Sequence, residues 1–324
     1  NILHIGAGEL TGGAAGGAYI LHRGLLELGI NSKVLTNSKE TFNDETVISI
    51  TKTMNQKLND LLRLYIDNAP LKIYRNKDAV TYSTGLCGYK FINHPLYQWA
   101  DIIHLHWING GFVNIKHLSR VDRKIVWTMR DMWPMTGGCH YSMGCNKYFD
   151  NCGYCNQLGS RIKYDLSWYI LKRKKRYLTK NIVLVSTSKW LTQCAKESFL
   201  FRNTRIETFY NNIDLVKFQP IEKSIAKKIM GLPIDKKIVL AGASSLNSKY
   251  KGFDKYFEAC KILNKRNHII LLLFGHTNGL NINQLEFEIR YLGYLHDSIT
   301  LRLAYSSADV FVAPSLYEAF GKTL

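Results

Sequence analysis

The segment 309–324, DVFVAPSLYEAFGKTL, constrains the fold more than any other part of this chain. Residues 310–313 form a short apolar run with β-branched side chains, which is typical of a buried parallel strand. Pro314 ends the run, because proline has no N–H to donate to a sheet. A loop with one carboxylate, Glu318, follows, and we expect the next helix to begin at Gly321, Lys322 and Thr323. This order predicts an α/β fold whose loops and helix N-termini bind phosphate ligands.

The same alternation of strand and helix occurs in both halves of the chain. Residues 2–5 predict a strand, a glycine-rich turn follows, and a helix then leads to a second strand near 33–36. A strand at 237–241 and a helix from Phe253 restart the pattern. We therefore expect two similar domains, 1–215 and 216–324, which is also the number that 324 residues suggest.

Composition limits the partners and the compartment. The net charge of +18 calls for an anionic partner, which composition alone leaves open among nucleic acid, anionic lipid and phosphorylated ligands. No run reaches the ~18 apolar residues of a membrane helix, and the chain begins directly with a strand-like segment rather than a signal peptide. Seven cysteines, an odd number, favour a reducing, cytoplasmic setting.

The glycine-rich turn at residues 6–17 raises the question of a dinucleotide site. The G-x-G-x-x-G pattern fails because Thr11 stands where its third glycine belongs. An acidic residue should end the second strand, yet residues 36–38 are Thr, Asn and Ser. Both tests disfavour an NAD-binding site at this turn. Gly12 and Gly13 remain candidates for contacts to a phosphate, with a simple tight turn as the alternative.

Polar side chains follow two predicted strands in the first half. His106 and Trp107 end the run that begins at Ala100, and Arg130 and Asp131 follow the strand at 124–129. Because ligand sites of α/β sheets lie at the carboxyl ends of strands, these residues are candidates for substrate contacts. Arg130 can donate hydrogen bonds but cannot accept a proton, so it is suited to an anionic group and not to a role as a base.

Four cysteines gather in the glycine-rich loop 136–158. They are Cys139, Cys145, Cys152 and Cys155, and the last two have the Cys-x-x-Cys spacing of a zinc knuckle. Our hypothesis is a structural zinc held by all four thiolates. Reduced cysteines near His140, or a redox pair at the last two, stay open as alternatives. A catalytic zinc is disfavoured, because four cysteine ligands leave no open position.

A basic helix is predicted over residues 161–180, with five consecutive charges at 172–176. The predicted apolar face consists of Ile162, Leu166, Tyr169, Ile170 and Tyr177. The charges indicate either a solvated face of a packed helix or a peripheral contact with anionic lipid. No pattern of a DNA- or RNA-binding module is present, so we expect no nucleic-acid partner.

Several motifs together resemble the retaining GT-B glycosyltransferases of the large family numbered four. They are ADVFVAPSLYEAFGKTL near the end, FYNNIDLVKFQP at 209–220, and HLHWINGG and WTMRDMWPMTGGCHY in the first half. The last two resemble the subgroup that builds bacterial capsule, O-antigen or exopolysaccharide. The resemblance implies two Rossmann-like, doubly wound domains that face a cleft, and it leads us to expect an incomplete C-terminal end, since the second Glu of the motif would fall beyond Leu324.

The resemblance also implies a function and roles for residues. A sugar would move from a UDP- or GDP-sugar to a hydroxyl of a glycan, which we expect to be lipid-linked, with retention and without a catalytic metal. The residues implied for catalysis are Glu318, Lys251, Asp131 and Arg130; for donor phosphate, Gly12, Gly13, Lys249, Lys251, Gly321, Lys322 and Thr323; and for the acceptor side, His106, Trp107 and His140.

The chain departs from the family pattern at two internal places. Arg130 stands where many relatives have a histidine, and an arginine expected shortly before Lys251 is missing, so Lys249 would have to compensate. We expect a cytoplasmic enzyme with a peripheral contact to the inner face of the membrane. Two alternatives remain: a non-catalytic module that binds nucleotide-sugars or glycans, and a basic, zinc-containing nucleic-acid binder.

Overall fold

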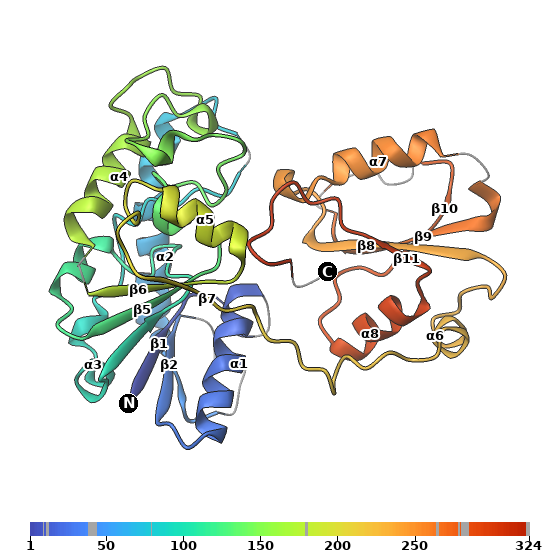
Figure 1. The fold of residues 1–324 in the computed structure, drawn as a ribbon, viewed down its shortest axis with the longest axis horizontal. Coiled ribbons are helices and arrows are strands. Elements are labelled where there is room, and N and C mark those ends of the chain that lie inside the picture. Colours follow the sequence, from blue (N-terminus) through green and yellow to red (C-terminus); the bar gives the residue numbers. More distant parts are fainter. Residues whose placement is uncertain are drawn as a thin grey trace. The chain divides into compact units, whose positions relative to one another are not determined.

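The computed structural model describes residues 1–8, 10, 13–37, 44–78, 80–178, 181–263, 266–277, 279 and 285–321. Gly12, Lys322 and Thr323 therefore lie outside the described residues. The chain divides into two compact units, Asn1–Asn212 and Ile213–Leu324 (Figure 1). Within the described residues, no helix combines the length and the apolar character that a membrane span requires.

Unit 1 contains a parallel sheet of seven strands in the order β3-β2-β1-β4-β5-β6-β7. The expected α/β architecture is confirmed, and the strand order reverses between β1 and β4, where ligands of doubly wound sheets bind. The strands are β1 (Ile2–Ile5), β2 (Ser32–Thr36), β3 (Val47–Ser49), β4 (Ile102–Leu105), β5 (Lys124–Met129), β6 (Ile182–Ser186) and β7 (Ile206–Thr208).

Helices cover both faces of this sheet, with α1 on the side opposite α4 and α5 (Figure 1). Right-handed crossovers require this, because the chain moves in opposite directions along the sheet before and after the reversal. The helices of unit 1 are α1 (Gly13–Glu27), α2 (Met54–Asn68), α3 (Pro95–Trp99), α4 (Leu166–Tyr177) and α5 (Lys189–Glu197).

Unit 2 contains a parallel four-stranded sheet in the order β10-β9-β8-β11. Alternate residues of the buried strand β9 pack on opposite faces: Leu271 and Leu273 lie in the core under α7, and Ile270 and Leu272 in the core under α8. The elements are α6 (Lys223–Ile229), β8 (Lys237–Ser245), α7 (Phe253–Ile262), β9 (Ile269–His276), β10 (Glu288–Tyr291), α8 (Ser298–Ser307) and β11 (Val310–Val312).

The basic helix differs from its prediction. It begins at Leu166, because the carboxylate of Asp165 accepts hydrogen bonds from the N–H groups of Ser167 and Trp168 and caps the helix there. Ile162 and Tyr169, expected on the apolar face, are 65% and 49% exposed. Lys174, expected among the solvated charges, is fully buried. The predicted membership of the apolar face, and the expectation that all five charges are solvated, were therefore wrong at these positions.

Helix α2 lies in the part of the sequence where no motif was recognised. Its start is a capping box in which the Thr53 hydroxyl accepts from Gln56 N and the Gln56 side chain accepts from Thr53 N. Asp67 is the only buried residue of this helix. Most of its apolar side chains are exposed: Met54, Leu58, Leu61, Leu62, Leu64, Tyr65 and Ile66.

The loop after β8 contacts the loop after β11 through a backbone hydrogen bond and a close backbone approach. Leu316 N donates to Tyr250 O over 2.8 Å, and Gly252 lies against the carbonyl of Pro314. Gly252 has a φ of +65°, and a Cβ there would approach the Pro314 oxygen to 2.2 Å. This position therefore needs glycine for its backbone conformation and for the close approach. Gly321, where a helix was expected, has a φ of +75° and is not helical.

Gly252→Ala should destabilise unit 2 more than Gly231→Ala. Gly231 also has a φ of +65°, but a Cβ there meets nothing within 4 Å, so its replacement adds only the cost of left-handed backbone, about 1–2 kcal/mol. Gly252→Ala adds a clash that overpacking data put at about 1–3 kcal/mol. Urea unfolding of the two variants, followed by circular dichroism, measures the difference. Equal loss of stability would contradict the proposed contact with Pro314.

Candidate active site

In unit 2, the two residues expected to bind the donor meet each other. The Lys251 ammonium lies 2.5 Å from Glu318 Oε1, and the Ser315 hydroxyl donates to the same oxygen over 2.8 Å. The two side chains are only 15% and 21% exposed. Adjacent parallel strands β8 and β11 explain the meeting, because their carboxyl ends lie at one edge of the sheet. One cation and one carboxylate are thus held side by side where a ligand is expected.

The backbone around Lys251 adds a second phosphate-binding element. Lys249–Lys251 form a short 3₁₀ turn, and Gly252 is the N-cap of α7 without any side-chain cap. The first N–H groups of a helix have no partner inside it and attract anions. Lys249 is exposed beside this turn, at the place where it would compensate for the missing arginine.

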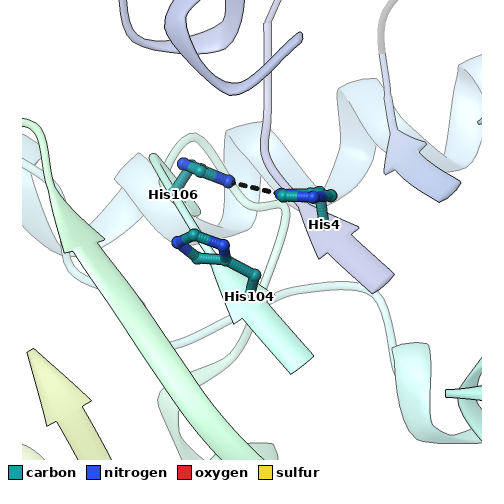
Figure 2. Close-up of side chains that lie close together, drawn as sticks. All are labelled: His4, His104 and His106. Atoms are coloured by element: carbon teal, nitrogen blue, oxygen red, sulfur yellow. Dashed lines mark hydrogen bonds between the residues drawn. The ribbon is translucent and has the colours of Figure 1, made fainter. Parts of the chain in front are cut away.

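In unit 1, three histidine rings stack at the strand-order reversal (Figure 2). His4 on β1 is the register partner of His104 on β4, and His106 lies two residues further on the same face. The ring centroids are 4.9 Å apart for His4 and His104, 4.3 Å for His104 and His106, and 5.3 Å for His4 and His106. Burial lowers the pKa of all three, that of His104 to about 3, so the stack is neutral at pH 7.

Arg130 determines where the protons of this stack lie. Its Nη2 can only donate, so His106 Nδ1, 3.2 Å away, must accept. His106 Nε2 then carries the proton and donates to His4 Nδ1 over 3.0 Å. His4 keeps its own proton on Nε2, which has no hydrogen-bond partner among the described residues. These tautomers are inferred from which atom donates and which accepts in each of these hydrogen bonds.

The histidine stack is the one group of three or more described residues whose potential metal ligands lie within 4.8 Å of one another. Two features make it a poor metal site. The hydrogen bond between His4 Nδ1 and His106 Nε2, 3.0 Å long, occupies one nitrogen of each of these rings (Figure 2). The Arg130 guanidinium also occupies a nitrogen of His106 and would repel a cation. We interpret the stack as a neutral, hydrogen-bonded support for Arg130.

Arg130 itself is a half-buried cation that lacks a carboxylate partner among the described residues. Its Nη1 donates to Asn211 Oδ1 over 2.6 Å, its Nε is buried without a partner, and no carboxylate of the described residues lies within 4.0 Å. Burial lowers its pKa to about 10, so it remains charged at pH 7. A Cβ on Gly17 of α1 would lie 2.8 Å from Nη1, so this glycine makes room for the guanidinium. A half-buried charge without a carboxylate partner favours an anionic ligand.

Asp131 and His140, both candidates from the sequence, form a hydrogen-bonded chain with Ser83, which sequence reasoning missed. Asp131 Oδ2 lies 2.6 Å from His140 Nδ1, and His140 Nε2 lies 2.9 Å from the Ser83 hydroxyl. Trp107 Nε1 donates to Asp131 Oδ2 over 3.1 Å. Ser83 is only 6% exposed, so a substrate carbon cannot reach its oxygen. The chain of bonds therefore joins loops and does not form a nucleophile.

The buried histidines make the stability of unit 1 depend on pH. The pKa of His104 falls from 6.5 in the unfolded chain to about 3 in the folded one, so the unfolded state binds more protons between these values. His104 therefore does not reduce the free energy of unfolding of unit 1 above about pH 6.5, and it lowers this free energy increasingly as the pH falls below that value. His104→Gln should flatten the decline between pH 6 and 4.5 by up to about 1.4 kcal/mol per pH unit.

Urea unfolding followed by tryptophan fluorescence measures this slope in unit 1 alone, because all six tryptophans precede residue 213. The internal control is the range above pH 7, where His104 is neutral in both states and the slopes of the two proteins should agree. Identical slopes below pH 6 would show that His104 is not buried in a neutral form.

Comparison with known proteins identifies the C-terminal part. Residues 235–324 match the family model described as "Glycosyl transferases group 1". The colanic acid biosynthesis glycosyl transferase WcaC of Escherichia coli (strain K12) is 26% identical over 237 residues, which cover 66% of this chain. The match spans 55% of the length of that relative.

Solved structures extend the likeness to the whole chain. Sucrose-phosphate synthase from Thermosynechococcus elongatus superposes with a TM-score of 0.63 at 16% identity, over 99% of this chain and 77% of that one. WaaG, a glycosyltransferase involved in lipopolysaccharide biosynthesis, gives 0.59 at 13% identity over 98% and 76%. HepE of Anabaena, in complex with UDP-glucose, gives 0.54 at 14% identity over 99% and 76%. Residues 235–324 thus carry the sequence pattern of the group 1 glycosyl transferases, and the chain as a whole has the GT-B glycosyltransferase fold.

Proposed function

We propose that this protein transfers a sugar from a nucleotide-sugar to a hydroxyl of a growing glycan, in the synthesis of a bacterial surface polysaccharide. The contact between Lys251 and Glu318 is the observation that carries the proposal. It places a cation and a carboxylate together inside the segment that matches the group 1 family. WcaC and WaaG, both named for polysaccharide synthesis, support the choice of pathway class.

The expected binding of the nucleotide-sugar donor follows from the charges of Lys251 and Glu318. A nucleoside diphosphate carries more negative charge than one carboxylate, so it would replace Glu318 as the partner of Lys251. The uncapped N-terminus of α7 would add N–H donors to the phosphates. Glu318, released from the lysine, would accept hydrogen bonds from hydroxyls of the donor sugar and orient it. The complexes of HepE with UDP and UDP-glucose support a nucleotide-sugar donor, with UDP as the first base to test.

The proposed transfer retains the configuration at the anomeric carbon. The bond between that carbon and the diphosphate breaks, and a bond to the acceptor oxygen forms on the same face. Lys251 stabilises the departing diphosphate as negative charge develops on it. The leaving phosphate oxygen takes the acceptor proton, so the step requires neither a carboxylate nucleophile nor a catalytic metal.

Lys251→Ala and Glu318→Ala should each lower turnover more than tenfold, which corresponds to about 1.4 kcal/mol. Wild-type protein should gain about 2.7 kcal/mol of stability from the correct nucleotide at 100 times its Kd, and Lys251→Ala should lose most of that gain. Thermal shift with UDP, GDP, ADP and their sugar conjugates, combined with a turnover assay, measures both effects.

Lys255→Ala is the matched control for these variants. Lys255 lies one turn further along, is 62% exposed and pairs with Glu258 on the same helix. It should keep both turnover and nucleotide stabilisation. Unchanged turnover in Lys251→Ala would refute the assigned site. Stabilisation by a nucleotide-sugar without any transfer would instead favour a non-catalytic binding module.

We further propose a lipid-linked acceptor that reaches the enzyme at an anionic membrane surface. The apolar side chains exposed along α2 support this, together with the net charge of +18. Arg130, a half-buried guanidinium without a carboxylate partner among the described residues, is suited to a phosphate of such an acceptor. We place Asp131, His106, Trp107 and His140 on this acceptor side as residues that position Arg130 and the neighbouring loops.

The double variant Leu58→Glu/Leu61→Glu should lose binding to vesicles that contain phosphatidylglycerol. Both leucines are 64% exposed on α2, and a carboxylate there opposes insertion and repels anionic lipid. Ile229→Glu/Ile299→Glu, at unit 2 positions 62% and 70% exposed, is the control with the same change of charge. Co-sedimentation measures binding, and equal sedimentation of both variants would refute the role of α2.

With acceptor in the vesicles, Arg130→Gln should raise the acceptor KM while nucleotide stabilisation is unchanged.

A further inference from the structure

The four cysteines of the loop 136–158 line a single cavity. Cys139, Cys145, Cys152 and Cys155 all border a space of about 270 Å³, which Asp78, Tyr82, Lys147 and other residues of the surrounding turns also line. This loop joins β5 to α4 and contains only short 3₁₀ turns. All four cysteines are free thiols, partly buried, and belong to no disulfide. The fold has thus brought together four sulfurs that are up to sixteen residues apart in the sequence.

Several residues of this loop that directly precede cysteines have left-handed backbone. Cys152, Gly153 and Tyr154 all have positive φ, at 50°, 99° and 46°, and lead directly into Cys155. Met143 and Gly144, at 50° and 83°, lead in the same way into Cys145. Left-handed backbone is unfavourable for residues other than glycine, so this conformation needs local interactions to persist.

Backbone N–H groups also point at two of the sulfurs. Gln157 and Leu158 donate to the sulfur of Cys155, and Gly137 donates to that of Cys152. Burial raises the pKa of both thiols, that of Cys152 to about 12, and these bonds offset part of that shift because they stabilise the charged form. The thiolate is the form of cysteine that binds metals.

A buried ammonium lies beside the cluster. Lys174 is fully buried, and its Nζ donates to the carbonyls of Thr136, over 2.9 Å, and Trp133. Burial lowers its pKa to about 7, and no carboxylate of the described residues lies within 4.0 Å of it. Negative charge on Cys139, Cys152 or Asp131 would stabilise its charged form. A buried cation is strongly favoured by a compensating anion. Four thiolates around a divalent ion carry a net charge of −2 and would supply one.

We propose that Cys139, Cys145, Cys152 and Cys155 bind one structural Zn²⁺ ion as four thiolates. Each thiol releases one proton, so four protons leave for every ion bound. The set is closed, which leaves no position for substrate or water. The ion fixes the loop that carries Thr136 and His140. This proposal does not depend on the sugar transfer proposed above.

Binding requires the side chains to turn inward. Zinc–sulfur bonds of about 2.3 Å in a tetrahedron place the sulfurs about 3.8 Å apart. In the structure no three of these sulfurs lie within 4.8 Å of one another, since only the histidine stack meets that limit among the described residues. The cavity that they border provides room for this movement.

Elemental analysis of the full chain, purified without chelator, should find about one zinc per chain. Cys152→Ser and Cys155→Ser should lower that content at least about fivefold, since each removes a ligand. Cys87→Ser, which changes a cysteine outside the cluster, and His104→Gln should retain the ion. A mercurial reagent should release the zinc, and the tryptophan-detected unfolding midpoint of unit 1 should fall with it.

Cobalt substitution keeps the proposal testable if the serine variants do not fold. Wild-type protein with Co²⁺ should show the sulfur-to-metal charge-transfer bands and the strong visible bands of a tetrahedral thiolate site. Three results would overturn the proposal: folded protein without zinc and with four titratable thiols in the loop, a disulfide among them by mass spectrometry, or zinc that is lost from His104→Gln and kept by Cys155→Ser.

Discussion

Parallel pairing of the strands is the constraint on which the rest of this structure depends. In unit 1 it places the ends of β1, β4 and β5 at one edge, and the register brings the rings of His4 and His104 side by side. In unit 2 it brings the loops after β8 and β11 together, so Lys251 meets Glu318 although 67 positions separate them. Each candidate site is thus a consequence of hydrogen bonding within a sheet, because parallel neighbours end in the same direction.

Unit 1 also contains two positively charged side chains that are partly or fully buried. Lys174 is fully buried and Arg130 is half-buried, and neither contacts a carboxylate of the described residues. Their surroundings differ. The guanidinium is supported by neutral imidazoles and by Asn211 at the end of the sheet, whereas the ammonium lies on a tryptophan ring beside thiols. The first environment suits an anion that arrives and leaves, such as a substrate phosphate. The second suits a permanent anionic cluster that holds a loop in place.

Sequence reasoning found the strands and most of the polar residues at their ends, and it failed where contacts are made across the fold. The capping box of Thr53 and Gln56 was a readable signal for α2, which was overlooked because the region carries no motif of chemistry. Ser83 and Asn211 had no such signal, since each gains its role only as a partner of His140 or Arg130. Lys174 was misjudged, because five adjacent charges on a helix necessarily point in different directions, and one of them points inward.

By itself, the sequence determined the alternation of strand and helix, the parallel sheets and the chemical types available at strand ends. Local patterns suffice for this, since an apolar run, a proline or a glycine-rich turn acts on its own neighbours. Only the tertiary structure decided which of these groups meet: Lys251 with Glu318, Arg130 with His106, and four cysteines around one cavity. The physical reason is that charge, pKa and hydrogen bonding depend on what surrounds a side chain in space, and residues distant in sequence supply most of those surroundings.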